Sequence, residues 1–414
     1  MTGSRTRRPA ALASAATAAA LVLGAAPTAT AAPAAPSTST STSLPAPRFL
    51  PTPPNTAYSL VWGLSRDGSV IGEYHPNVPG QSAPHAIRWH PDHLGYTTLA
   101  ALPGDLSAHP SGINDTGTVI GASSRSLADN HPIRWAPDGT PTPLPLPAGV
   151  LGGNAQGINN AGVVVGGAYD YAYRSMPVKW QPDGTRVDLP PLPGDDAGDA
   201  VSVSDAGVIA GTSERRLADG HYKETPVLWS PSGAVSALPL PPGVDGARVV
   251  RMSHNGVVLG QGRRVGDGEY EFDRVLVWTP DGAVRDAGYG RARAVNSAGT
   301  AVGAAFDANR STFAARWNRH GAQTLLDGPA GRQSEAMAVN STGTAVGDVQ
   351  GPDWNRTTAL LWRPDGTAVP LPPSPLSPYA HASFINDAGV VAGIAVELDA
   401  AGEPVAARPV VWTR

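Results

Sequence analysis

Short apolar segments recur along the chain, and each lies between two glycines that are four residues apart. The residues between the glycines are Ser, Thr, Val, Ile, Ala or Leu, which is typical of a short buried β-strand. The glycine pairs are Gly68/Gly72, Gly117/Gly121, Gly162/Gly166, Gly207/Gly211, Gly256/Gly260, Gly299/Gly303, Gly343/Gly347 and Gly389/Gly393. Consecutive second glycines are 43 to 49 residues apart. A repeat of this period indicates a solenoid or a propeller.

A short polar residue stands three positions before the first glycine of every pair. Only Asn and Ser occur there, namely Ser65, Asn114, Asn159, Ser204, Ser253, Asn296, Asn340 and Asn386. In a type I turn, such a side chain at the first position accepts a backbone hydrogen bond, and glycine at the fourth position adopts a positive φ. We therefore expect a strand before this turn (strand a) and the apolar strand after it (strand b).

A second turn follows about 15 to 20 residues later in most units, within the spacing usual for a hairpin. The pattern Trp-x-Pro-Asp/Ser-Gly begins at Trp135, Trp180, Trp229, Trp278 and Trp362. Trp89 and Trp317 keep the tryptophan, whereas His93 replaces Gly and Arg319 replaces Pro in their turns. The pattern predicts strand c, which ends at the tryptophan, and strand d in the Pro- and Leu-rich segment that follows. At this fixed place we expect the tryptophans to pack in the core and not to stack on a ligand.

Four antiparallel strands per unit predict an all-β protein, a β-propeller with eight four-stranded blades, or seven if a terminal unit is degenerate. Proline cannot donate to a sheet ladder, so the Pro-rich strand d belongs at the outer edge. Strand a contains small residues such as Gly112 and Gly157, as a strand crowded round an axis requires. The last unit ends at Arg414 without a strand d, and residues 48–54 resemble the missing strand. We expect this N-terminal strand to close the last blade.

The N-terminal region is predicted to lie outside the propeller, which spans residues 48–414. Residues 1–31 combine basic residues, an apolar stretch at 9–26 and the small residues Ala29-Thr30-Ala31, the pattern of a secretory signal peptide. Both the general and the twin-arginine export routes stay open, because Arg7-Arg8 is followed by a poor continuation. Residues 32–47 are rich in Ala, Pro, Ser and Thr and form a linker. The predicted location is extracellular, as a secreted monomer without a membrane span.

The composition of the chain excludes several kinds of binding partner and cross-link. Charged residues make up 15% of the chain and the formal net charge is -4, which argues against a nucleic-acid surface. The chain contains no cysteine, so disulfides and thiolate metal sites are excluded.

The repeat resembles the HAF family of extracellular repeats. Ile113-Asn114, Ile158-Asn159 and Ile385-Asn386 begin units of the form Ile-Asn-x-x-Gly-x-x-Val-Gly or close to it. His85-Ala86-Ile87, ahead of Trp89, is the nearest match to the family's His-Ala-Phe tripeptide, which is degenerate in the other units. The resemblance covers the chain from about Trp62 onward. It implies a secreted, propeller-like protein and no agreed catalytic residues.

The variable loops between strands b and c are the predicted binding surface, because variable loops on a rigid scaffold often hold function. They contain aromatic and arginine side chains that suit sugar faces, carboxylates or a protein partner. The candidate binding residues are Tyr169, Tyr171, Tyr173, Arg174, Arg215, Tyr222, Arg263, Tyr270 and Trp354. The alternative is that these loops are solvated and have no ligand.

Other chemistry has weaker support in the sequence. His85, His90 and His93 could ligate a metal, but they straddle a strand end and a turn, so ordinary polar side chains at the surface are favoured. Asp195, Asp196 and Asp199, assigned to one d–a link, could bind Ca²⁺, but no calcium-loop pattern is present. We predict no metal and no cofactor.

Three functions follow from the sequence. The first is a secreted, non-catalytic protein that binds a polysaccharide or another extracellular macromolecule. The second is a polysaccharide hydrolase or lyase, with acids gathered from Glu214, Glu269, Glu271 or Asp348, although no catalytic motif is present. The third is a structural protein of the cell envelope.

Overall fold

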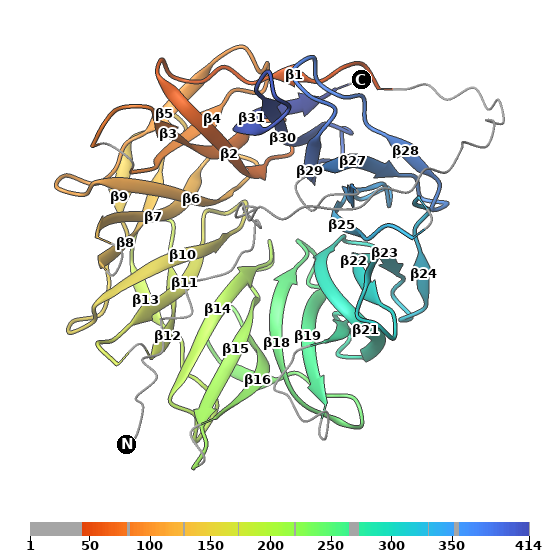
Figure 1. Cartoon of the computed structure of the whole chain (residues 1–414). Coiled ribbons are helices and arrows are strands. Elements are labelled where there is room, and N and C mark those ends of the chain that lie inside the picture. The colour runs from red at the N-terminus through yellow and green to blue at the C-terminus, as the bar shows by residue number, and fades with distance from the viewer. Residues whose placement is uncertain are drawn as a thin grey trace, which may run out of the picture.

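The computed structural model describes residues 44–80, 83–126, 129–172, 174–218, 221–264, 273–329, 331–351 and 356–413. Over these residues the chain forms a ring of eight antiparallel blades, with no helix (Figure 1). This confirms the predicted all-β propeller. The signal peptide predicted at 1–31, and the linker at 32–47 up to residue 43, lie outside the described residues. No helix in the described part of the chain could cross a membrane.

Strands a to d follow one another in the chain in every blade except blade 8, whose strand d is the N-terminal strand β1. Blades 1 and 2 are β2 (Thr56–Leu64), β3 (Val70–Pro76), β4 (His85–Trp89), β5 (Tyr96–Leu99), and β6 (Ser107–Ile113), β7 (Val119–Ser126), β8 (Asp129–Trp135), β9 (Pro141–Pro143). Blades 3 and 4 are β10 (Gly152–Ile158), β11 (Val164–Tyr169), β12 (Ser175–Trp180), β13 (Arg186–Asp188), and β14 (Ala197–Val203), β15 (Ile209–Arg216), β16 (Tyr222–Trp229), β17 (Val235–Ala237). Blades 5 and 6 are β18 (Val244–Met252), β19 (Val258–Arg264), β20 (Arg274–Trp278), β21 (Val284–Val295), β22 (Ala301–Phe306), β23 (Thr312–Trp317) and β24 (Gln323–Leu325). Blades 7 and 8 are β25 (Ser334–Val339), β26 (Ala345–Gln350), β27 (Thr357–Trp362), β28 (Ala368–Pro370), and β29 (Ala380–Ile385), β30 (Val391–Leu398), β31 (Pro404–Trp412), β1 (Arg48–Phe49).

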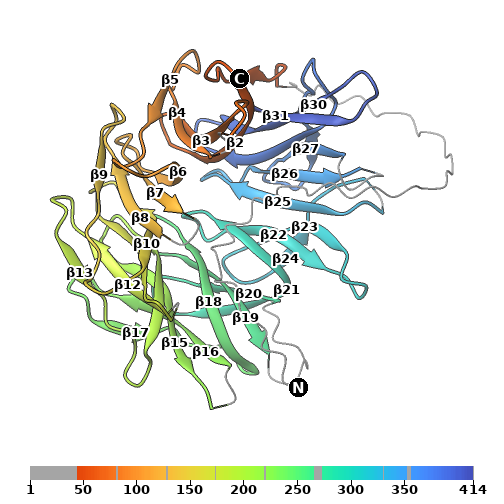
Figure 2. The same cartoon turned by 60° about the vertical axis from the view of Figure 1, so that its left-hand side comes forward.

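The two ends of the propeller meet in blade 8, as predicted. β1 pairs antiparallel with β31, with Arg48 opposite Val411 and Phe49 opposite Val410. Leu50 extends the pairing, since its N–H donates to the carbonyl of Pro409 at 2.9 Å. Adjacent strands a lie side by side around the ring (Figure 2), and β2 contacts β29 where the ring closes (Figure 1). The ring is therefore closed, and blade 8 has its fourth strand.

Blades 5 and 6 share one strand, which the sequence did not predict. The 12-residue strand β21 pairs with β20 through Val284–Tyr289 and with β22 through Gly290–Val295. It is strand d of blade 5 and strand a of blade 6, so no d–a link separates these blades. The two blades form one seven-stranded sheet.

The two glycines of each pair serve different purposes. The first glycines have φ between 79° and 95°, as expected for the turn. The second glycines lie where strand b approaches strand a most closely. A Cβ atom there would stand 1.9 to 2.9 Å from a strand a carbonyl oxygen. At this level strand a has a β-bulge in every described blade, and its extra residue bends it round the axis.

The tryptophan that recurs at the end of strand c in each unit joins neighbouring blades. The eight residues Trp89, Trp135, Trp180, Trp229, Trp278, Trp317, Trp362 and Trp412 are fully buried. Seven of them donate the indole N–H to a backbone carbonyl just after strand d of the preceding blade, at 2.6 to 2.9 Å. Trp317 instead bonds Gln323 of its own blade, at the junction where β21 leaves no link. The predicted role in the core is confirmed.

The asparagines of the a–b turns form a second set of contacts between blades. In Asn159, Oδ1 accepts from the N–H of Val163 within the turn, and Nδ2 donates to the carbonyl of Ser204 in the next blade at 2.9 Å. Asn386 closes the ring in the same way on Ser65, at 3.1 Å. A serine at this position can cap its own turn but cannot reach the next blade.

The glycine pair of blade 3, Gly162 and Gly166, provides a direct test of the different roles of the first and second glycine. Gly166→Ala places a methyl group 2.0 Å from the carbonyl oxygen of Asn154, where only backbone could move. Gly162→Ala meets no atom closer than 3.7 Å and is strained only by its φ of +81°. We expect Gly162→Ala to cost about 1–2 kcal/mol of unfolding free energy and Gly166→Ala to cost at least about 3 kcal/mol. Urea denaturation measures both, and equal costs would contradict the proposed close approach.

Candidate functional site

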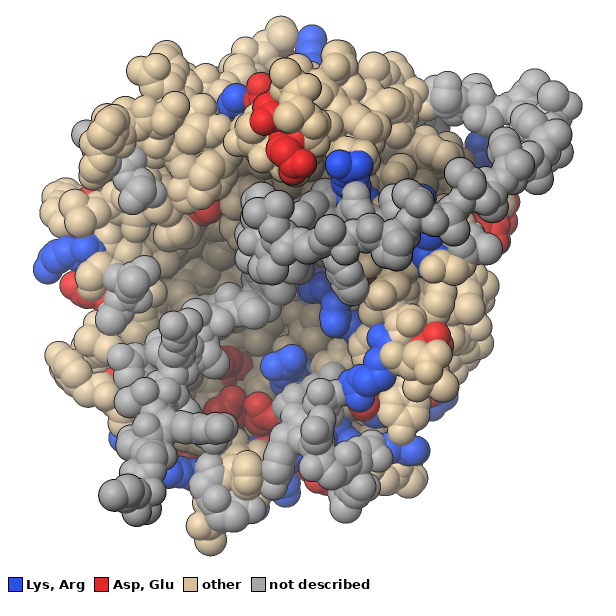
Figure 3. Space-filling model, viewed as in Figure 1, with Lys and Arg blue, Asp and Glu red and all other residues tan. Residues whose placement is uncertain are grey.

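A ring of mostly polar side chains surrounds the central hollow. In every blade the position is the strand a residue just before the one that lies opposite the second glycine. These residues are Leu60, His109, Asn154, Asp199, Arg248, Arg291, Glu335 and His381. Because the strands occupy equivalent places in the repeat, the residues lie at one height, and we call them the funnel ring. Figure 3 shows acidic and basic side chains gathered in the hollow over β14, β15 and β18.

Between blades 1 and 2 the funnel-ring residue His109 is paired with an acid. The carboxylate of Glu73 on β3 contacts His109 Nδ1 at 2.9 Å and His75 Nε2 at 3.1 Å. Burial alone would raise the pKa of Glu73, but the hydrogen bonds from His109 and His75 outweigh it and hold this pKa at about 2. Glu73 is a carboxylate with its partners in place, as in a structural ion pair.

Two other interfaces are neutralised in the same way. His381 Nδ1 contacts Asp348 Oδ2 at 2.9 Å. Burial would lower the pKa of His381, but the negative charge of Asp348 and its hydrogen bond together outweigh burial and raise this pKa. Between blades 6 and 7, Glu335 binds Arg293 at 2.7 Å and Arg291 at 3.4 Å.

Blade 4 differs, because its acids gather with one another. Glu214 on β15 lies directly opposite Glu224 on β16, and Ala197 on β14 is its partner on the other side. Asp199 lies two residues along β14 and accepts a hydrogen bond from Ser175 of blade 3. Like charges in directly opposed strand positions repel. We call Asp196, Asp199, Glu214 and Glu224 the carboxylate recess.

The pKa values of this recess reflect the crowding. Burial, together with the negative charges of Asp199, Glu224 and Asp196, raises the pKa of Glu214 to about 8. Burial also raises the pKa of Asp199, against the hydrogen bond from Ser175. At neutral pH Glu214 therefore holds a proton and can donate it, while water still reaches part of its side chain.

Blade 5 supplies positive charge beside these acids. Burial raises the pKa of Glu224, and the guanidinium groups of Arg248 and Arg263 partly oppose that shift. On the other side, a cavity of about 210 Å³ between blades 3 and 4 is lined by Ser175, Asp196 and apolar residues such as Met176. The recess thus places carboxyl groups between an apolar cavity and two arginines.

The predicted binding residues that the structure describes lie in blades 3 to 5. Tyr171 is 74% exposed, at the tip of the b–c loop of blade 3. Arg174 in the same loop pairs with Asp170 at 2.8 Å and reaches Asp196 at 3.9 Å. Tyr222 lies close enough to act on the pKa of Arg174. The b–c loops of blades 3 and 4 therefore border the carboxylate recess.

The remaining candidates are placed differently. Tyr169 is half-buried at the end of β11, with its hydroxyl beside Gly152. Arg215 reaches Asp195 at 3.9 Å, and Arg263 is buried against Asp245 at 3.2 Å. Tyr173, Tyr270 and Trp354 lie outside the described residues, as do Glu269 and Glu271.

Two acids of the recess, Asp199 and Glu224, were not correctly predicted from the sequence. Asp199 lies within β14 and not in the d–a link to which we assigned it. Asp195 does lie in that link, where its carboxylate accepts a hydrogen bond from Ser213 at 2.7 Å. Glu224 was missed altogether. Alignment of the eight units would have shown the funnel ring as a polar position inside an otherwise small-residue strand.

The histidines considered as metal ligands do not converge. His93 Nε2 contacts the carbonyl of Gly68, His90 contacts Thr97, and His85 stacks on Tyr74. In the part of the chain that the structure describes, no group of three or more His, Asp or Glu residues is placed to hold a metal ion.

Comparison with known proteins defines the class. No family model matches the chain, and no curated protein matches it. It is similar to puromycin hydrolase, with a TM-score of 0.50 and 14% identity over 83% of this chain and 60% of that chain. It is equally similar to a post-proline cleaving enzyme from Rickettsia typhi, with a TM-score of 0.50 and 10% identity over 83% and 57%. At such identities the similarity shows the fold alone, and the protein belongs to the class of β-propellers.

The pKa of Glu214 predicts an unusual pH dependence of stability. The native protein keeps this proton up to about pH 8, whereas the unfolded chain releases it near the ordinary value of 4.5. The free energy of unfolding should therefore fall as pH rises from 4.5 to 8. Glu214→Gln, which cannot ionise, should be more stable than the native protein by about 2–4 kcal/mol at pH 9 and nearly equal to it at pH 5. Thermal unfolding at both pH values measures the difference.

Glu73→Gln is the matched control. The pKa of Glu73 is depressed, so its stabilisation is present above pH 4.5 and is lost as pH falls towards 2. This variant should lose about 2–3 kcal/mol at neutral pH. If both substitutions destabilise the protein at pH 9, Glu214 is not the protonated acid that the geometry indicates.

Proposed function

We propose that the protein binds a glycan in the carboxylate recess between blades 3 and 5. The observation that supports this most is the close grouping of Asp199, Glu214 and Glu224. At other interfaces of the propeller the acids are paired with histidine or arginine, whereas these three acids lie next to one another. Such a cluster lowers stability at neutral pH, and perturbed acids of this kind concentrate at functional sites.

The chemistry of the recess suits sugar hydroxyl groups. A protonated Glu214 donates a hydrogen bond, an ionised neighbouring carboxylate accepts one, and the guanidinium groups of Arg248 and Arg263 donate further bonds. The exposed ring of Tyr171 offers a plane for the apolar face of a sugar near the loop that contains Arg174.

The predicted leader at residues 1–31 supports an extracellular ligand. Together with the resemblance to HAF-type repeats, it favours a secreted protein that meets polysaccharides outside the cell. We propose this location from the sequence pattern, and the exposed Tyr171 and Arg174 are compatible with a ligand outside the cell.

A second candidate function is hydrolysis of the bound glycan, and the raised pKa of Glu214 favours it specifically. A carboxyl group that keeps its proton near neutral pH can protonate a glycosidic oxygen. Asp199 or Glu224 would then act as the second carboxyl group that glycoside hydrolysis requires. Two enzymes that share the fold act on other substrates, so the similarity itself adds no support for hydrolysis.

Binding and hydrolysis can be separated with one set of variants. We expect the secreted form to be retained on one or more plant or bacterial polysaccharides, and Glu214→Ala to weaken retention about tenfold. Glu214→Gln keeps a donor and an acceptor, so it should bind within about threefold of the native protein. Released oligosaccharides are measured in parallel with retention.

The outcomes have distinct meanings. Retention without products supports binding alone. Products that fall at least about a hundredfold in Glu214→Gln, and that decline in the native protein above pH 8, establish hydrolysis. Glu397→Gln, which changes an acid paired with Arg408 in blade 8, is the control and should change neither measurement. Retention that is unaffected by Glu214→Ala would rule out the recess as the binding site.

A further inference from the structure

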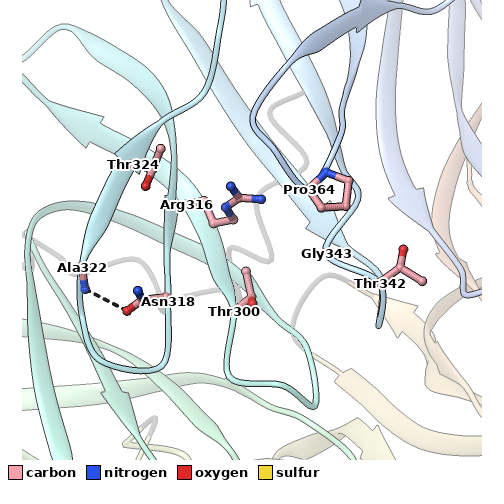
Figure 4. Close-up of a pocket in the computed structure, with 8 residues that line it drawn as sticks. All are labelled: Thr300, Arg316, Asn318, Ala322, Thr324, Thr342, Gly343 and Pro364. Atoms are coloured by element: carbon pink, nitrogen blue, oxygen red, sulfur yellow. Dashed lines mark hydrogen bonds between the residues drawn. The ribbon is translucent and has the colours of Figure 1, made fainter.

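A pocket between blades 6 and 7 lies on the face formed by the a–b and c–d turns, opposite the loops that border the carboxylate recess. It has a volume of about 320 Å³. Thr300, Arg316, Asn318, Thr324, Thr342 and Pro364 line it together with two smaller residues. Figure 4 shows the guanidinium group of Arg316 pointing into the space between the β23–β24 turn and the turns of blade 7.

The repeat shows what a cation normally does at the position of Arg316. The equivalent residue is the one just before the strand c tryptophan. In blades 1 to 3, Arg88, Arg134 and Lys179 donate to the carbonyl of the c–d turn proline in the next blade, at 2.9, 2.7 and 3.0 Å. These bonds join neighbouring blades, and they give the charged side chain a hydrogen-bond partner within the protein.

Arg316 does not follow this pattern. The corresponding carbonyl would belong to Pro364, and Arg316 makes no hydrogen bond to it (Figure 4). Among the described residues Arg316 has no hydrogen-bond or ion-pair partner, and its side chain is half-buried. A guanidinium group in such a setting attracts an oxyanion, for which its planar fork is well matched.

The rest of the lining consists of neutral donors. Asn318 uses its Oδ1 atom to accept from the N–H groups of His320 and Ala322, which leaves the amide NH₂ directed elsewhere. The hydroxyl groups of Thr300 and Thr324 have no partner in the described chain. No Asp or Glu lines the pocket within the described residues. One positive charge surrounded by hydroxyl and amide groups fits a ligand with one negative charge and several hydroxyl groups.

We propose that this pocket binds an acidic sugar, with the carboxylate on Arg316 and the sugar hydroxyls on Thr300, Thr324 and Asn318. A volume of about 320 Å³ accommodates a monosaccharide ring, whereas a bare phosphate ion would leave most of it empty. The proposal concerns the turn face and does not depend on glycan binding in the carboxylate recess.

Calorimetric titration of the full protein tests the proposal with three probes: glucuronate, glucose and inorganic phosphate. We expect glucuronate to bind at least about tenfold more tightly than either of the others, because only it has both the charge and the hydroxyl groups. Arg316→Gln should weaken glucuronate binding about tenfold to a hundredfold without changing the midpoint of thermal unfolding. Arg316→Lys keeps the charge without the fork and should give an intermediate affinity.

Arg134→Gln is the matched control, because it removes the cation from the same repeat position where the Pro182 carbonyl accepts its bond. It should bind glucuronate as the native protein does and unfold more easily. The proposal is overturned if glucuronate does not bind, if glucose binds equally well, or if Arg134→Gln weakens binding as much as Arg316→Gln. Equal binding of phosphate would overturn the assignment to a sugar acid.

Discussion

The close approach of strands a and b at the second glycine of each unit is the constraint on which the propeller depends. A carbonyl oxygen of strand a occupies the space where a Cβ atom would stand, and in several blades the tryptophan ring covers the same glycine. The indole ring is held in this place because its N–H donates to a backbone carbonyl of the preceding blade. The second glycine therefore serves two contacts at once: the close approach of strands a and b inside a blade, and the packing of the tryptophan ring that joins neighbouring blades. Replacement of the glycine or of the tryptophan would open the blade and its interface together.

This scaffold leaves the funnel ring free to vary. Glycine, tryptophan and asparagine maintain the geometry, so the strand a residue one place before the bulge can be Leu, His, Asn, Asp, Arg or Glu without change of fold. At several interfaces the residue of the funnel ring meets a partner that balances it, as Glu335 meets Arg293. Blade 4 is the exception, where acids face acids. The departure from local charge balance distinguishes a candidate site from the structural pairs that surround it.

The repeat made the fold predictable, because the turn chemistry of Asn114 or Gly162 is local and is visible in eight copies. The shared strand β21 was not predictable, since a missing link between blades 5 and 6 looks in sequence like an ordinary irregular segment. The site was only partly predicted. Glu214 was named among possible acids and Arg174 among binding residues, but their convergence near Asp196 depends on how neighbouring blades pack. Asp199 was misplaced because a polar residue near a Pro-Gly turn resembles a loop.

The central claim is that Glu214 is a neutral, proton-donating acid at physiological pH, held so by its neighbours in blade 4. The most direct test is a ¹³C NMR titration of the side-chain carboxyl groups in protein labelled at glutamate, with the Glu214 signal assigned by its loss in Glu214→Gln. This signal should titrate near pH 8, well above the signals of the other glutamates. Titration near the ordinary value of 4.5 would show that the acids of blade 4 are solvated surface charges, and the case for a site in this recess would fail.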